Sequence, residues 1–171
     1  KRFVILQAGP GRGKSLVAVA LGQLLEGKSV CILATTKALM EQYQNEFQYL
    51  ELSLIKGRSS YECNLDSSYN AASARCTSVY KCGLKLNGRC TYYRLKAQEQ
   101  VARVVITDVA YFLTTYLYAD GLRPKKLPFD VVICDEADLL EGWLLNTVVI
   151  RITRTTFRRV LSGIGFPGLF M

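Results

Sequence analysis

The sequence contains no histidine and no long uncharged stretch. Because histidine is the side chain that ordinarily titrates near neutral pH, its absence means that the formal net charge of +8 changes little in that range. The longest run without a charged residue, residues 160–171, is twelve residues, whereas a membrane-spanning helix needs about 20. A secretory signal peptide is also lacking. We therefore expect no membrane contact and a location in the cytoplasm, or in the nucleus of a eukaryote.

Low-complexity sequence is absent as well, since 50% of the residues are hydrophobic and 21% are charged. This balance supplies a full hydrophobic core and excludes a disordered chain. With 171 residues, the chain has room for one ordinary domain and a small insertion. It begins with Lys1 rather than Met and stops after an apolar, arginine-dotted stretch, so we take it as a piece of a longer protein.

The positive charge is concentrated rather than evenly spread. Residues 75–103 hold seven cations against one anion, Glu99, and so supply a charge of +6. A second group of arginines lies at residues 151–159. Such concentration is typical of proteins that bind nucleic acid, and a solvated charged surface is the alternative.

Six cysteines fall into two groups. Cys31 and Cys134 lie in β-branched, apolar runs, where a thiol behaves as a small buried hydrophobe. The other four, separated by 12, 5 and 7 residues, are Cys63, Cys76, Cys82 and Cys90. Four neighbouring thiolates suit either Zn²⁺ or an iron–sulfur cluster. Most structural zinc sites have short paired spacings, which are missing here, so the pattern favours a [4Fe–4S] cluster and leaves zinc and disulfides open.

Short apolar runs alternate with helical periodicity along most of the chain. We expect strands at residues 2–7, 29–35, 104–107 and 130–134. We expect helices at residues 15–25, 37–50 and 109–118. Strands that are apolar on both faces predict an α/β fold, in which a parallel sheet is covered by helices on both sides. Residues 56–90 break this rhythm, and we expect the four cysteines to organise them.

A glycine-rich turn follows the first expected strand and opens the first expected helix. Its sequence, AGPGRGKS, consists of Ala8, Gly9, Pro10, Gly11, Arg12, Gly13, Lys14 and Ser15. It fits the phosphate-loop pattern except that Ala8 replaces the first glycine. The backbone N–H groups and the helix N-terminus would cradle the phosphates of ATP, Lys14 would reach the β- and γ-phosphates, and Ser15 would ligate Mg²⁺. The alternative is a glycine-rich turn followed by a chance Lys–Ser pair.

The apolar run at residues 131–134 ends abruptly in the acids of a DEAD sequence. Ligands bind at the carboxyl ends of strands in open α/β sheets, which is where Asp135 and Glu136 are expected. We predict that Asp135 holds Mg²⁺ directly or through water, and that Glu136 polarises the attacking water. An acidic cap at the start of a helix is the alternative.

Together these two motifs resemble those of superfamily 2 helicases, whose first motor domain has a RecA-like α/β fold. Residues 32–47 are similar to the group's motif Ia, which implies that Thr35, Thr36 and Lys37 contact the nucleic-acid backbone. Helix capping by either threonine is an alternative that does not exclude this role.

The segment GRSSYEC, residues 57–63, resembles the GRxNYxC start of the iron–sulfur domain in XPD- and DinG-type DNA helicases. The resemblance implies that the four cysteines hold a [4Fe–4S] cluster and that Arg58 lies beside DNA or the cluster. It also implies translocation from 5′ to 3′ on single-stranded DNA. The sequence departs from the pattern at Ser60, at Asp108 in place of Asn, and at Asp138 in place of the His of DEAH.

We therefore interpret the chain as the first motor domain of an ATP-dependent DNA helicase, active as a monomer with a second RecA-like domain that this sequence lacks. The expected divisions are a motor domain at residues 1–56 and 104–145, an iron–sulfur insertion at 57–103, and the start of a helical arch at 146–171. Since superfamily 2 motors complete their ATP site with arginines from the second domain, we expect this chain alone to hydrolyse ATP very slowly. Two rivals remain: a phosphate-loop NTPase switch that is not a helicase, and a DNA-binding module with a structural zinc site.

Overall fold

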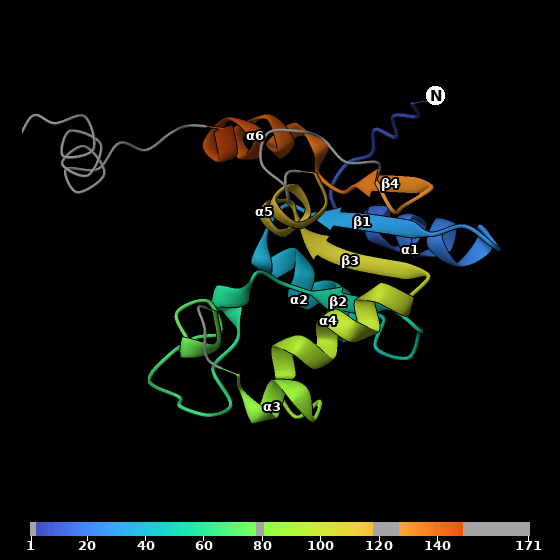
Figure 1. Cartoon of the computed structure of the whole chain (residues 1–171). Coiled ribbons are helices and arrows are strands. Elements are labelled where there is room, and N and C mark those ends of the chain that lie inside the picture. Colours follow the sequence, from blue (N-terminus) through green and yellow to red (C-terminus); the bar gives the residue numbers. More distant parts are fainter. Residues whose placement is uncertain (1–2, 78–80, 118–126, 149–171) are drawn as a thin grey trace, which may run out of the picture.

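A parallel β-sheet forms the centre of the protein (Figure 1). The structure, a computed structural model, describes residues 3–77, 81–117 and 127–148. Within these residues the sheet has four strands in the order β2–β3–β1–β4. Their bounds are Val30–Ala34 for β1, Ser53–Ile55 for β2, Val104–Asp108 for β3 and Val131–Cys134 for β4. Ala34 pairs with Asp108 and Leu33 with Cys134, so the carboxyl ends of these three strands meet at one edge of the sheet.

Helices cover both faces of this sheet, which confirms the predicted α/β class. The α-helices are α1 (Lys14–Leu24), α2 (Lys37–Glu46), α3 (Gly83–Leu86), α4 (Thr91–Val101), α5 (Val109–Phe112) and α6 (Leu140–Val148). Shorter 3₁₀ turns are η1 (Arg58–Ser60), η2 (Arg75–Thr77) and η4 (Ala137–Leu139), and a π-helical stretch, η3 (Leu113–Leu117), continues α5.

Alternating side chains of the strands divide the core between the two faces. Val30, Ile32 and Ala34 of β1 pack with residues of α1 and α2. Cys31 and Leu33, which alternate with them, pack with α5 on the opposite face. This period-2 division is what a strand buried on both sides requires. The prediction that Cys31 and Cys134 are packing cysteines is therefore confirmed, because both thiols belong to the second of these clusters.

Helix α1 lies close to the sheet at one small residue. A Cβ atom added to Gly22 would lie 3.2 Å from Cγ1 of Val104 on β3, so glycine permits this close approach. Only one side of α1 is buried, chiefly at Ala18, Val19 and Gly22. The helix predicted at residues 15–25 therefore packs against the sheet, while Leu16 and Leu24 are exposed.

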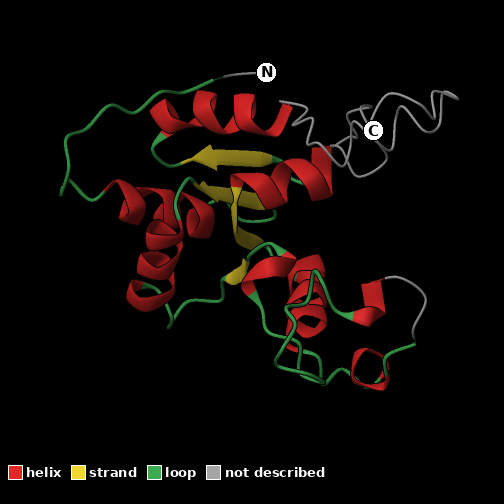
Figure 2. Ribbon diagram, turned by 90° about the vertical axis from the view of Figure 1, so that its left-hand side faces the viewer, coloured by secondary structure: helices red, strands yellow, loops and turns green. Residues whose placement is uncertain are grey.

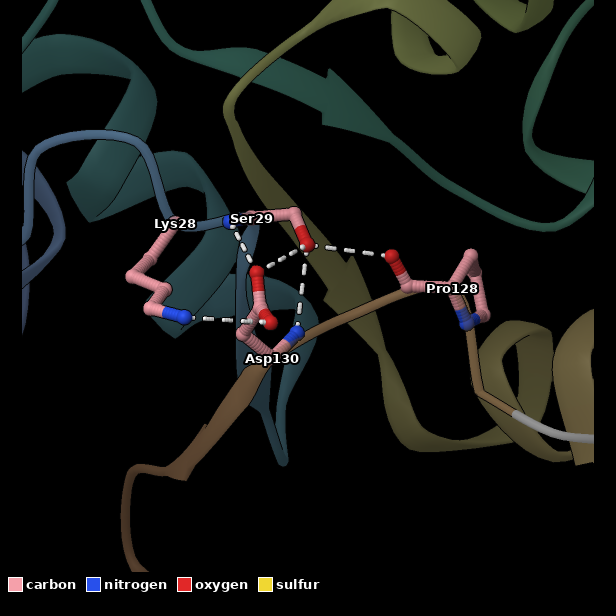
Figure 3. A network of polar contacts seen from close by, with 4 residues as sticks. All are labelled: Lys28, Ser29, Pro128 and Asp130. Carbon is pink, nitrogen blue, oxygen red and sulfur yellow. Dashed lines mark hydrogen bonds and ion pairs between the residues drawn. The ribbon is translucent and has the colours of Figure 1, made fainter.

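The amino ends of β1 and β4 are joined by a network of polar contacts (Figure 3). Asp130 Oδ2 accepts hydrogen bonds from the Ser29 backbone N–H at 3.0 Å and from Ser29 Oγ at 3.1 Å. Lys28 Nζ lies 3.6 Å from Asp130 Oδ1. These contacts fix the register of β4 against β1 at the end of the sheet opposite the predicted ATP site.

Residues 57–77 and 81–90 extend away from the sheet as a lobe of loops and short helices (Figures 1 and 2). We call it the cysteine-rich lobe. It is attached through tyrosines: Tyr61 and Tyr92 have ring centroids 5.7 Å apart, and Tyr92 packs with Ile55 and Val105 of the sheet. Asn64 and Thr91 also exchange two hydrogen bonds, which tie the lobe to the start of α4.

One expected strand is absent from the described residues, and other expected features lie outside them. The first predicted strand is wrong for residues 3–7, which have no regular secondary structure and pair with no described strand. Most of the expected arch at residues 146–171 and the arginines at 151–159 lie outside the described residues. None of the described helices is both long enough and apolar enough to cross a membrane.

Candidate nucleotide-binding site

The predicted phosphate loop lies between residues 3–7 and α1, with residues 9–13 exposed. Gly11 has φ 70° and Gly13 has φ 76°, in the left-handed region where an L side chain is strained. Gly13 is also the N-cap of α1 and makes no side-chain cap, so the first N–H groups of the helix lack a side-chain partner there. Backbone N–H groups of this kind, at the positive end of a helix dipole, favour a bound anion.

Lys14 is directed back into this loop. Its Nζ donates to the carbonyl oxygen of Ala8 at 3.2 Å and more weakly to that of Gly9 at 3.5 Å. The ammonium group therefore sits over the turn that the phosphates would occupy, held by carbonyls that a phosphate oxygen can replace. This is the position that the sequence predicts for a lysine that contacts phosphate.

The fold brings Ser15 and Asp135 together although they are 120 residues apart. Ser15 Oγ, on the first turn of α1, donates a hydrogen bond of 3.0 Å to Asp135 Oδ2, just beyond β4. Asp135 is only 6% exposed. A hydroxyl and a carboxylate in contact beside a phosphate loop are oxygen ligands of the type that Mg²⁺ prefers, so these residues fit a magnesium ion.

Tyr43 completes this arrangement. Its hydroxyl group donates a hydrogen bond of 2.7 Å to the same Asp135 Oδ2. Burial, followed by the hydrogen bond to Asp135, raises the pKa of Tyr43 above its ordinary value of 10.0, so the phenol stays protonated as a donor. The sequence predicts a helix at residues 37–50, which includes Tyr43, but no contact of Tyr43 with Asp135. The one available signal was that a buried tyrosine hydroxyl needs a partner.

Glu136 follows directly and is exposed. Its backbone has φ 53° and ψ 56°, and among the described residues it is the only non-glycine with positive φ. The strand thus ends in two acids with different surroundings. Asp135 is buried and hydrogen-bonded, while the Glu136 side chain faces solvent, where a water molecule can reach it.

The residues predicted to contact nucleic acid lie in two separate places, at the start of α2 and at the attachment of the cysteine-rich lobe. Thr36 Oγ1 accepts a hydrogen bond of 3.1 Å from the Leu39 N–H, so the capping alternative is confirmed for Thr36. Thr35 is 2% exposed, and its hydroxyl has no partner among the described residues. Lys37 is exposed beside them at the start of α2.

Arg58 lies elsewhere, at the attachment of the cysteine-rich lobe. Its Nη2 donates to the hydroxyl of Tyr93 at 2.8 Å, and its guanidinium lies 5.1 Å from the centre of the Tyr92 ring. Tyr92 is itself 4% exposed and contributes to the core.

The four lobe cysteines are not gathered into a metal site. Cys63, Cys76, Cys82 and Cys90 are all free thiols, and the described residues contain no group of three or more side chains placed to hold a metal ion. In this arrangement they do not fit a shared [4Fe–4S] cluster or zinc ion. Among the described residues, tyrosine packing and the Asn64–Thr91 hydrogen bonds hold the lobe, and its organisation by the four cysteines stays a prediction.

Comparison with known families agrees with the geometry of the loop and the acidic strand end. A family model described as "Type III restriction enzyme, res subunit" (ResIII) matches residues 1–141, which include both motifs. The chain belongs to the ResIII family. No curated protein and no solved structure matches it.

The ResIII family places the chain among the N-terminal domains of superfamily 2 helicases, which confirms the wider of the two resemblances. The sheet with helices on both faces is accordingly a RecA-like domain. ResIII membership does not extend to the XPD- and DinG-type iron–sulfur group. It also implies an ATP-dependent motor of the helicase type, without specifying the nucleic acid or a direction of travel.

Proposed function

We propose that the chain is the ATP-binding motor domain of a DNA helicase that translocates on single-stranded DNA. The observation that carries this proposal is the hydrogen bond of 3.0 Å between Ser15 and Asp135 beside the Lys14 loop. It joins the two halves of an ATP site across 120 residues of sequence. A glycine-rich turn followed by a chance Lys–Ser pair would not require an acidic strand end in contact with its serine.

Each residue of the site has a separate role. The N–H groups of residues 9–13 and the start of α1 hold the phosphates, and Lys14 balances the charge of the terminal ones. Ser15 and Asp135 supply oxygen ligands for Mg²⁺, which when bound neutralises charge that develops on the phosphates. Glu136, exposed beside them, accepts a proton from the attacking water or orients that water.

Nucleotide binding tests the proposal. We expect Lys14→Ala and Asp135→Ala to weaken binding of ATP in the presence of Mg²⁺ by about 10–100-fold each, the usual effect of losing a charge-assisted contact. Lys96→Ala removes the same charge from α4 on the opposite face of the sheet and is the control. Binding by calorimetry that is unaffected by Lys14→Ala would contradict the proposal and favour a relic nucleotide site.

DNA binding is supported by the charge of residues 75–103 and by the exposed start of α2 at Thr36 and Lys37. Travel from 5′ to 3′ is supported only by the sequence resemblance. We expect single-stranded DNA to bind in a salt-sensitive manner and to change the affinity for ATP. Nucleotide binding without any effect of single-stranded DNA would favour the NTPase switch instead. The proposed partner for hydrolysis is a second RecA-like domain.

An iron–sulfur cluster in the lobe remains part of the proposal on sequence grounds alone, since the described thiols are not assembled for it. Anaerobic purification tests it by iron and zinc content and by the brown colour of a cluster. Cys63→Ser should abolish bound iron, whereas Cys134→Ser, in the sheet, should not. Stoichiometric zinc without iron would favour the structural zinc site, and absence of both metals would remove a metal from the proposal.

A further inference from the structure

Asp135 Oδ2 receives two hydrogen bonds from two different helices. Ser15 donates from α1 at 3.0 Å and Tyr43 donates from α2 at 2.7 Å. The Tyr43 side chain is 1% exposed and Asp135 is 6% exposed, so water contributes little to holding this carboxylate. Three elements therefore meet at one oxygen atom: α1, α2 and the residue that follows β4.

This arrangement distinguishes the two oxygens of the carboxylate. Oδ2 is occupied by two donors, while the described residues provide no hydrogen bond to Oδ1. A carboxylate held through one oxygen keeps a fixed orientation and leaves the other oxygen available to a metal ion or its water. Residues that hold a metal ligand through such a hydrogen bond have large effects on metal affinity although they do not touch the metal.

Packing alone does not explain why residue 43 is a tyrosine rather than a phenylalanine. The Tyr43 ring belongs to the core beneath α1 and α2, and its centroid lies 5.9 Å from that of Phe47. A phenylalanine could fill that space equally well. The hydroxyl adds a polar group to an apolar core, where it needs a partner. The structure supplies one in the carboxylate proposed to hold Mg²⁺.

We propose that Tyr43 is a positioning residue for the magnesium site, acting by orienting the Asp135 carboxylate through its phenol O–H. The inference rests on the proposed function, since it assumes that Asp135 binds Mg²⁺ together with ATP. It assigns no contact between Tyr43 and the nucleotide.

The test is a Mg²⁺ titration of ATP binding by the Tyr43→Phe variant of the 171-residue chain. This substitution keeps the ring and removes only the hydroxyl. We expect the Mg²⁺ concentration for half-maximal effect to rise about 10-fold. The affinity for ATP in EDTA should stay unchanged, because the phosphate loop and Lys14 are intact.

Tyr111→Phe is the matched control. Tyr111 is 4% exposed and also donates to a carboxylate, Glu99 Oε2, at 2.8 Å, but it lies on the opposite face of the sheet. It loses an equivalent buried hydrogen bond and should leave the Mg²⁺ dependence unchanged. Circular dichroism and thermal unfolding of both variants establish that they are folded.

A double-mutant cycle with Asp135→Asn provides a second readout. If Tyr43 acts through Asp135, Tyr43→Phe lowers ATP affinity at subsaturating Mg²⁺ in the unsubstituted chain but has no further effect there in the Asp135→Asn background. Additive effects would overturn the inference. So would an unchanged Mg²⁺ dependence in Tyr43→Phe, an equal loss of affinity in EDTA, or the same shift in Tyr111→Phe.

Failure of the proposed function would look different. In that case the unsubstituted chain itself would bind ATP no better with Mg²⁺ than in EDTA, and the inference would fall with it. A Mg²⁺-dependent chain with an indifferent Tyr43→Phe variant refutes only the role of Tyr43.

Discussion

Glu136 has a backbone conformation that most side chains avoid. Its φ of 53° lies in the left-handed region, where the other described residues with positive φ are glycines: Gly11, Gly13, Gly27 and Gly88. For an L residue this conformation costs about 1–2 kcal/mol. The cost falls on the residue proposed to act on water, which agrees with the general tendency of backbone strain to gather at functional sites.

Glycine at this position should therefore stabilise the fold. We expect Glu136→Gly to have a free energy of unfolding about 0.5–1 kcal/mol higher than Glu136→Gln, because relief of strain exceeds the added chain entropy of glycine. Both variants lose the carboxylate, so their comparison isolates the backbone. Urea unfolding measures the difference, and equal or reversed stabilities would show that Glu136 is not strained.

Glu99 is a buried acid outside the ATP site. It is 6% exposed and accepts a hydrogen bond of 2.8 Å from the Tyr111 hydroxyl. Burial raises its pKa above the ordinary 4.5, while the Tyr111 hydrogen bond and Lys96 lower it by less. Since the folded-state pKa is the higher one, protonation favours the folded state, and this contribution is lost as the pH rises through the folded-state pKa.

We predict that Glu99→Gln is more stable than the unsubstituted chain at pH 7. Glutamine keeps an oxygen acceptor for Tyr111 and carries no charge to desolvate. The advantage should shrink toward zero below pH 4.5, the ordinary value of the glutamate pKa, where Glu99 is protonated in both states. Denaturant unfolding across this range measures it, and a pH-independent difference would contradict the assignment.

At the residue scale, the sequence predicted only those residues of the site that belong to a recognisable motif. Ser15 and Asp135 belong to two recognisable patterns, and the structure brings them into contact. The hydrogen bond of Tyr43 was not predicted because its partner lies 92 residues further along the chain. A hydroxyl partner at that distance depends on how the helices pack, which periodicity does not encode.

At the scale of elements, Asp130 ties two strands together before their pairing begins. Hydrogen bonds from Ser29 lower its pKa below the ordinary 3.8, and Lys28 contributes less. The ionised form is therefore favoured in the folded state. This stabilisation is present above pH 3.8 and is lost as the pH falls through the lower folded-state pKa.

Asp130→Asn should accordingly be less stable than the unsubstituted chain at neutral pH and should lose less stability on acidification. Lys28→Met, which removes only the ion pair of 3.6 Å, should retain most of the acid-dependent loss. Urea unfolding at neutral pH and at about pH 3 compares them. Equal acid sensitivity of Asp130→Asn and the unsubstituted chain would show that Asp130 contributes nothing here.

The elements that were predicted are those with a sustained period. Strands β1, β3 and β4 and helices α1 and α2 appear close to their expected bounds. Strand β2 has three residues, too few to show a pattern. Helix α4 was missed because its buried positions include Glu99 and Tyr92, so no apolar stripe marks its inner side. Residues 3–7 were predicted as a strand but do not form one, since an apolar run becomes a strand only if a neighbouring strand pairs with it.

At the scale of the whole molecule, apolar side chains are exposed at the start of the chain and along α1. Phe3, Val4 and Ile5 are 91–92% exposed, and Leu16 and Leu24 of α1 are also exposed. Among the described residues, no strand pairs with the outer edge of β4. An exposed apolar segment and an open strand edge both favour association between chains.

Ile5→Lys should therefore reduce self-association of the 171-residue chain. Removing one isoleucine from an apolar contact is worth about 1.5–3 kcal/mol, so the concentration at half-association should rise about 10-fold or more. Gln48→Lys adds the same charge at an exposed polar position and is the control. Light scattering over a concentration series measures both. Equal effects would assign the change to net charge rather than to the apolar segment.

The layered sheet was predictable at this scale because strand and helix patterns alternate along the chain, but the contacts that hold the cysteine-rich lobe were not. Its expected organiser was a set of four thiols, and its observed contacts are the Tyr61–Tyr92 packing and the Asn64–Thr91 hydrogen bonds. Spacing along a sequence specifies which residues could meet. It does not determine whether the intervening loops bring them together.

The Ser29–Asp130 contact also has a consequence in time. Its partners are 101 residues apart, and a ribosome adds about 5–20 residues per second. About 5–20 s therefore pass between the synthesis of strand β1 and that of β4, and only then can the two strands pair. Contacts between distant residues slow folding, since a long loop must close before they form. During translation, the side of β1 that β4 will cover is an unpaired edge open to chaperones and to neighbouring nascent chains.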